Sequence, residues 1–140
     1  MKYLVYLLIA IMLLIPASAP ARQAEPAPHF DGFAVYLVYT DKRAAEVRII
    51  PGYDCGLQAF DIYLNTTDYE VESQYDLILG KGHFIAIGFE TEMKLDEEYV
   101  IATVHFSENT RAEITRADFA IAHTPDAPAV EIRGTIWLDF

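Results

Sequence analysis

Short segments in which apolar and polar residues alternate run through most of the chain, and this pattern constrains the fold more than any other feature. They are rich in Val, Ile, Tyr, Phe and Thr and cover residues 33–39, 45–50, 57–65, 75–79, 83–89, 99–106, 118–123 and 130–138. Alternation with a period of two is typical of half-buried β-strands. Breaks rich in Gly and Pro, such as Gly80-Lys81-Gly82, separate the segments. Because each strand must bury one apolar face, we predict an all-β fold, a β-sandwich of about eight or nine strands.

The same alternation predicts which side chains face the core. In segment 57–65 Phe60 points inward, whereas Asp61 and Tyr63 point outward. Ile101 is expected to lie outside or towards a second layer, and Trp137 to point outward. The other side chains expected to point inward are Ile62, Leu64, Val100, Ala102, Val104, Phe106, Val130, Ile132, Gly134, Ile136 and Leu138. Residues 92–98, which are acidic, suggest a single helical turn between two strands.

The amino-terminal residues have the pattern of an export signal. Lys2 precedes an apolar run over residues 3–15, and small residues follow up to Ala21. We predict a signal peptide over 1–21, a Pro/Ala-rich linker over 22–32 and one β-sandwich domain over 33–140. The alternative is an uncleaved anchor, although the run is shorter than the ~20 residues of a spanning helix. The chain is therefore expected to be secreted, extracellular or on the cell surface, with a membrane contact only if the segment stays uncleaved.

Charge and composition exclude several classes of protein. The net charge is −11, and becomes −12 once Lys2 is removed with the signal. Such an acidic domain repels phosphate backbones, so we expect no nucleic-acid partner. The 53% hydrophobic content argues against disorder. Cys55 is the one cysteine, so no internal disulfide forms, and we interpret it as a small, partly buried side chain.

No group of residues predicts catalysis. Beyond the signal only Ser73 and Ser107 are serines, and neither lies in a nucleophile motif. The four histidines lack metal-ligand spacing. Three alternating carboxylates could hold Ca²⁺ on one edge of an extended segment, but a charged strand that discourages aggregation explains them better. They are Asp68, Glu70 and Glu72. We predict a chain that is not an enzyme and binds no cofactor, with Ca²⁺ as the alternative.

The order of four strand motifs resembles that of a known family. The motifs are Leu57-Gln58-Ala59-Phe60-Asp61-Ile62-Tyr63-Leu64-Asn65, Phe84-Ile85-Ala86-Ile87-Gly88-Phe89, Val100-Ile101-Ala102-Thr103-Val104-His105-Phe106 and Ile132-Arg133-Gly134-Thr135-Ile136-Trp137-Leu138. In this order they are similar to the cohesin domain of the cohesin and carbohydrate-binding-module superfamily. The resemblance implies a nine-stranded jelly roll that is exported and non-catalytic. It also implies dockerin binding through a flat sheet face that includes the Phe-Asp strand, with Asp61 matching its outward aspartate.

Three residues are therefore candidates for partner binding. Asp61 follows from the resemblance, while Tyr63 and Trp137 are aromatic side chains on predicted outward faces, where they could anchor a protein or stack on a sugar ring. The preferred hypothesis is a secreted interaction module for a protein partner of the dockerin kind. The alternatives are a carbohydrate-binding module that recognises a polysaccharide and a structural subunit of the cell envelope.

Overall fold

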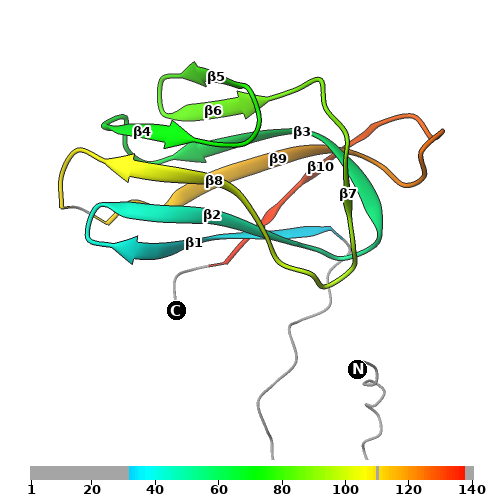
Figure 1. Cartoon of the computed structure of the whole chain (residues 1–140), viewed down its shortest axis with the longest axis horizontal. Helices are drawn as coiled ribbons and strands as arrows, with labels where there is room; N and C mark the ends of the chain where they lie inside the picture. The colour runs from blue at the N-terminus through cyan, green and yellow to red at the C-terminus, as the bar shows by residue number, and fades with distance from the viewer. Residues whose placement is uncertain (1–31, 110, 138–140) are drawn as a thin grey trace, which may run out of the picture.

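The computed structural model describes residues 32–109 and 111–137, and these form two facing β-sheets with no helix (Figure 1). The predicted signal peptide and nearly all of the predicted linker lie outside the described residues. The two-sheet arrangement confirms the prediction of an all-β sandwich. None of the described residues belongs to a helix long and apolar enough to cross a membrane.

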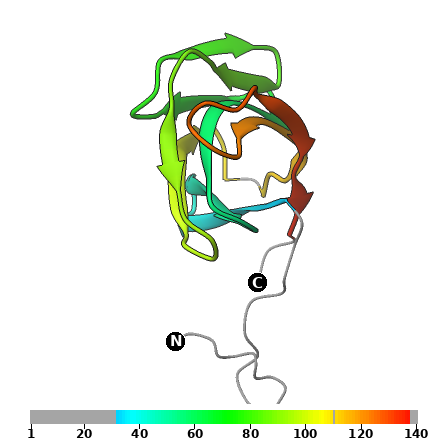
Figure 2. The same cartoon turned by 90° about the vertical axis from the view of Figure 1, so that its right-hand side faces the viewer.

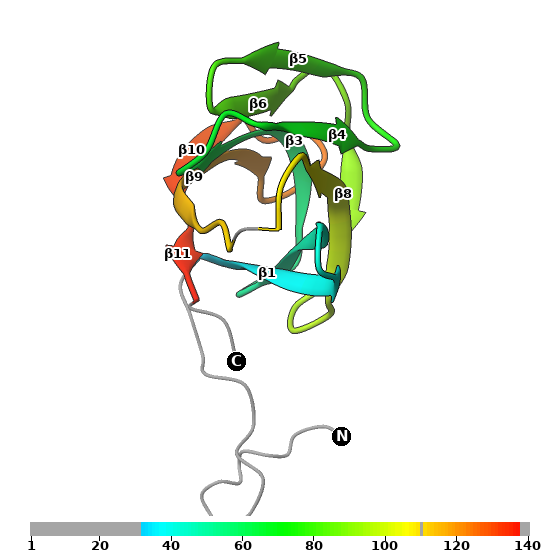
Figure 3. The same ribbon diagram turned by 90° about the vertical axis from the view of Figure 1, so that its left-hand side faces the viewer.

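Sheet A has the strand order β11-β1-β2-β8-β4. Its strands are β1 (Phe33–Asp41), β2 (Ala44–Pro51), β4 (Tyr69–Glu72), β8 (Tyr99–Phe106) and β11 (Thr135–Ile136). Sheet B has the order β10-β9-β3-β6-β5, with β7 also paired to β3. Its strands are β3 (Cys55–Leu64), β5 (Leu77–Gly80), β6 (His83–Ala86), β7 (Thr91–Met93), β9 (Ile114–Ala122) and β10 (Val130–Arg133). Figures 2 and 3, which view the molecule from its two ends, show the sheets enclosing a common interior.

The chain passes repeatedly between the two sheets, as in a jelly roll. The last predicted strand is one example, because it is divided into β10 in sheet B and β11 in sheet A. Gly134 lies at the crossing, and a Cβ atom there would lie 2.7 Å from Cε2 of Phe119. Only glycine fits this close approach. The division, together with the short β4 and β7, explains why the described residues contain more strands than the sequence suggested.

Aromatic rings fill the centre of the sandwich. Phe60 is 1% exposed and meets Phe84 and Tyr75 in edge-on contacts, with ring centroids 6.4 and 5.6 Å apart. Phe60, Ile62 and Leu64 are all buried, so the inward set predicted for β3 is confirmed. Burial of each such side chain contributes about 1.5–3 kcal/mol to folding.

One face assignment is wrong because β8 contains an irregularity. The pairing between β2 and β8 shifts register between Val47 and Arg48, so that Ala102 and Val100 pair with consecutive residues of β2. Ile101 is thereby turned into the core at 2% exposure, whereas Val100 is 45% exposed. A β-bulge of this kind inserts one residue and reverses the alternation beyond it. Alternation alone could not place it.

Two further expectations differ from the structure. Val130 is 44% exposed, because β10 is the outermost strand of sheet B. The acidic segment 92–98 holds the end of β7 and a turn in which the N–H of Glu97 donates to the carbonyl of Lys94 at 3.2 Å, in place of a helical turn. Leu138 lies outside the described residues.

Candidate partner-binding face

The outer face of sheet B carries Asp61 and Tyr63 on its central strand, β3. Cross-strand pairing extends a row from Asp61 across five of the six strands of the sheet. Its members are Ile78, Ile85, Asp61, Asp118 and Arg133. A second row contains Gly80, His83, Tyr63 and Arg116. Both side chains that the sequence placed outward on β3 therefore lie on one open sheet face, which we call the sheet B face.

Asp61, Tyr63 and His83 form a compact group at the centre of this face. Nδ1 of His83 lies 2.9 Å from Oδ1 of Asp61. The imidazole ring is stacked on the Tyr63 ring, with centroids 4.7 Å apart and planes 7° apart. The Asp61 carboxylate raises the pKa of the Tyr63 hydroxyl above its ordinary value. The larger cause is a hydrogen bond from the hydroxyl to the carboxylate, and the second is the negative charge of the carboxylate. The group therefore holds the Tyr63 ring in a fixed orientation.

Two arginines extend the group towards β9 and β10. The guanidinium of Arg116 lies 5.5 Å from the centroid of the Tyr63 ring, and its Nε lies 2.8 Å from Asp118. Nε of Arg133 donates to the same carboxylate at 2.7 Å. Exposed ion pairs of this kind add about 0–1 kcal/mol each to stability. Their main effect here is to fix the positions of two positive charges around the Asp118 carboxylate.

A groove of about 350 Å³ opens beside Asp61 on the same face. Ala59 and Ala120 pair across β3 and β9, and their small side chains leave the space open. Ile85 lines it from β6, while Glu131 and Arg133 line it from β10. The groove thus joins an apolar surface to a charged rim.

Trp137 does not belong to this face. Its backbone N–H donates to the carbonyl of Val35 at 2.9 Å, which ties it to β1 in sheet A. Its ring is stacked on Tyr36 at a centroid distance of 5.4 Å. It packs with Tyr36 against a small apolar cluster that also contains Ala34 and Ile50, separate from the main core. The structure therefore brings together two of the three candidate residues and separates the third.

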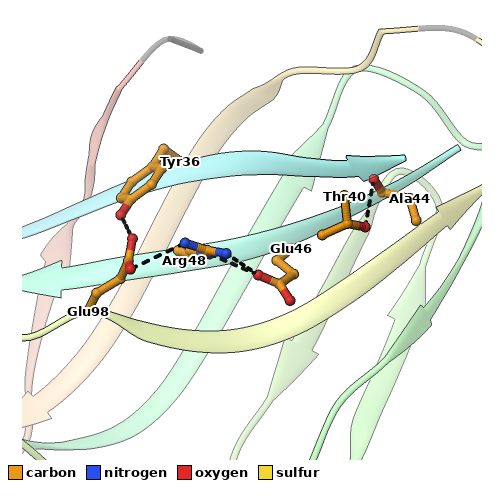
Figure 4. A network of polar contacts seen from close by, with 6 residues as sticks. All are labelled: Tyr36, Thr40, Ala44, Glu46, Arg48 and Glu98. Carbon is orange, nitrogen blue, oxygen red and sulfur yellow. Dashed lines mark hydrogen bonds and ion pairs between the residues drawn. The ribbon is translucent and has the colours of Figure 1, made fainter. Parts of the chain in front are cut away.

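A polar network continues from Tyr36 across the strands of sheet A (Figure 4). The Tyr36 hydroxyl donates to Glu98, which also accepts from Arg48 at 3.3 Å. Arg48 in turn donates to Glu46 at 2.9 Å. These groups satisfy one another, so the network explains how Tyr36 is held in place under Trp137.

The acidic residues 68–72 lie at the other edge of sheet A. Glu70 and Glu72 are exposed on β4, the outermost strand of that sheet, in agreement with a charged edge strand. Glu72 lies 3.3 Å from Nε2 of His105. Within residues 32–109 and 111–137 no three His, Cys, Asp or Glu side chains are grouped so that they could hold a metal ion.

Sequence reasoning missed most neighbours of Asp61 and Tyr63. His83, Arg116, Asp118 and Arg133 come from three other strands, and their proximity depends on pairing registers that one sequence does not reveal. The alternation within β6 could have placed His83 on an outer face. It could not have placed the imidazole ring on Tyr63.

Comparisons with known proteins show the fold alone. No family model matches the chain, and no curated protein matches it. Two crystal structures of the GH20 exo-β-N-acetylglucosaminidase from Vibrio harveyi are similar. The complex with N-acetylglucosamine is 7% identical with a TM-score of 0.49, and an inactive mutant is 8% identical with a TM-score of 0.50. Each match covers 76% of this chain but 18% of the enzyme, so the chain spans less than a fifth of that protein.

Proposed function

We propose that this chain is a secreted, non-catalytic, cohesin-like module that binds a protein partner through the sheet B face. The observation that carries the proposal is the group formed by Asp61, His83 and Tyr63 on the central strands of an open sheet, beside a groove. Rigid side chains bind without a large loss of conformational entropy, which is typical of the anchors of protein interfaces.

The distribution of apolar and charged groups also supports a protein partner. Ile78 and Ile85 lie at the β5 side of the face, and Ile78 is 55% exposed. Asp118 and Arg133 lie at the opposite side. An amphipathic surface of a partner could bury its apolar side chains on the isoleucines and pair its charges with the rim. The acidic net charge of the chain would speed association with a basic partner.

The surroundings of the aromatic rings favour a protein over a polysaccharide. His83 comes from β6 and Arg116 from β9, the two strands that flank β3, so both lie beside the Tyr63 ring. A sugar that stacked on Tyr63 would have to displace one of them. Trp137 already contacts Tyr36 through its ring. We therefore rank the carbohydrate-binding and envelope-subunit alternatives below the protein-binding hypothesis.

Capture of partners by immobilised variants tests the proposal. The bait is the chain, and the sample is the set of secreted and surface proteins of the same organism, quantified by mass spectrometry. We expect a protein that the unsubstituted chain retains and that Asp61→Asn or Tyr63→Ala retains at least about tenfold less. Asp61→Asn removes the charge but keeps the size of the side chain.

Glu72→Ala is the matched control, since it removes an exposed carboxylate from sheet A. It should retain the same protein as the unsubstituted chain. The proposal would be contradicted if the chain retained no protein, or if Asp61→Asn retained as much of it as the unsubstituted chain. It would also be contradicted if the chain bound insoluble polysaccharide in a way that depends on Trp137.

A further inference from the structure

Strand β5 forms an edge of sheet B that differs from the edges formed by β4 and β10. It pairs with β6 on one side, and in Figures 1 and 3 no described segment lies beyond its other side. The backbone N–H and carbonyl groups along such an edge can pair with a further strand. Proteins usually protect these edges with charged side chains.

The side chains of β5 offer no such protection. Ile78 is 55% exposed and Leu79 is 63% exposed, and the strand Leu77–Gly80 contains no charged residue. By contrast, β4 at an edge of sheet A carries Glu70 and Glu72, and β10 at the far edge of sheet B carries Glu131 and Arg133. The apolar edge at β5 is therefore the one of these three that is suited to strand addition.

The flanking charges make this edge complementary to a second copy of itself. Asp76 precedes β5 and Lys81 follows it. When two copies of a strand pair antiparallel about a twofold axis, the start of one lies against the end of the other. Each Lys81 would then lie within about one residue of the partner's Asp76. At each end of the two paired strands, a lysine of one copy would therefore lie near an aspartate of the other copy.

The pattern of side chains also selects a register. When the twofold axis is perpendicular to the sheet, the outer faces of the two B sheets lie on the same side. Two registers are then possible. In the first, Ile78 faces the partner's Ile78, and in the second, Leu79 faces the partner's Leu79. In the first register Leu77 faces the partner's Leu79, and every central pair is apolar. In the second, Ile78 faces the partner's Gly80 and Leu77 faces the partner's Lys81. Because apolar cross-strand pairs stabilise a sheet, the first register is favoured.

We propose that two copies of this chain associate through antiparallel pairing of their β5 strands, with Ile78 facing the partner's Ile78. The pairing joins two B sheets into one continuous sheet and places two sheet B faces side by side. A four-residue strand buries less area than a standard interface, so the dimer forms at high protein concentration and dissociates on dilution. The association does not require the proposed partner, and the two proposals can fail independently.

Sedimentation over a range of concentrations at about 0.15 M salt, where screening reduces repulsion between acidic copies, tests the association. We expect the average mass of the chain to rise towards that of a dimer with concentration. Ile78→Lys should remain monomeric. Val100→Lys, which changes an exposed Val on sheet A, should dimerise like the unsubstituted chain.

Cysteine cross-linking tests the register. Ile78→Cys should form a disulfide between copies, because directly opposite residues have Cα atoms about 4.5–5.5 Å apart. Leu79→Cys should not, since its two copies would be separated by roughly 8 Å. A monomer at every concentration, dimerisation of Ile78→Lys, or equal cross-linking of both Cys variants would overturn the proposal.

Discussion

The imidazole ring of His83 occupies the space that a side chain at Gly80 would need. A Cβ atom at Gly80 would lie 2.7 Å from Cδ2 of His83 and nearer still to Nε2. The absence of a side chain at Gly80 on β5 therefore lets His83 lie flat against Tyr63 and bond to Asp61. The absence of a side chain at Gly80 thus helps to set the arrangement of the proposed binding face.

Gly80→Ala should displace His83 without unfolding the protein. The ring can rotate away, so we expect a loss of about 1 kcal/mol, the usual value of one hydrogen bond. The ¹H and ¹³C resonances of His83 and Tyr63 should shift. Gly32→Ala is the control, because its Cβ would have no neighbour nearer than 3.8 Å. Unchanged His83 resonances in Gly80→Ala would contradict this role.

Phe60→Ala should be among the most destabilising substitutions in β3. It removes a ring that is 1% exposed and contacts Tyr75, Phe84 and Phe89. We expect a loss of about 3–5 kcal/mol in the free energy of unfolding, measured in urea. Phe60→Leu should lose less unfolding free energy than Phe60→Ala. It can be measured in place of the Ala variant if that variant does not fold. A loss below about 1 kcal/mol in Phe60→Ala would contradict the core assignment.

Removal of the hydroxyl group should change the stability of the protein in opposite directions at two tyrosines. The hydroxyl oxygen of Tyr69 is buried with no hydrogen-bond partner among the described residues, whereas that of Tyr36 donates to Glu98. An unsatisfied buried group costs about 1–3 kcal/mol. Tyr69→Phe should therefore stabilise the protein, by about 1 kcal/mol, and Tyr36→Phe should destabilise it. Denaturant unfolding of both variants checks the signs, and destabilisation by Tyr69→Phe would show that its hydroxyl has a partner.

Cys55 should make stability depend on pH in the alkaline range. Burial, with a smaller contribution from the charge of Asp54, raises the pKa of its thiol to about 11. The ordinary pKa of the thiol is about 9, so the folded state holds its proton more tightly than the unfolded chain does. The stabilisation is complete below the unfolded pKa and is lost as the pH rises from about 9 towards 11.

Comparison with Cys55→Ala isolates this effect from the tyrosines and lysines that titrate in the same range. We expect the unsubstituted chain to lose on the order of 2 kcal/mol more stability than Cys55→Ala between pH 8 and pH 11. Because Cys55 is 6% exposed, its thiol should also react with a thiol reagent at pH 8 only after unfolding. Parallel pH profiles of the two proteins would contradict the raised pKa.

Much of the fold could be predicted from the sequence because a period of two specifies which face of a strand is buried. The alternation placed Phe60 inward and Asp61 outward correctly. It failed at Val100 and Ile101, where a bulge inserts one residue into the pairing. It also could not show that Trp137 returns to β1, because that contact joins residues about a hundred positions apart.

The candidate site was less predictable for a related reason. Asp61 and Tyr63 belong to one strand, so their common face follows from local geometry. His83 and Arg116 reach Tyr63 through the registers of two further strands. These registers depend on packing of the whole sandwich. The chemical character of the face therefore emerged only from the structure.

Site-specific photocross-linking tests most directly whether the sheet B face binds a partner. A photoreactive amino acid is placed at Glu131, on the rim of the groove, and in a second protein at Glu72, on the edge of sheet A. Each is irradiated with the secreted proteins of the same organism. We expect a cross-linked protein from position 131 that is absent from position 72 and is lost when Asp61→Asn is added. A cross-link from position 72 alone, or none from position 131, would contradict the assignment of this face.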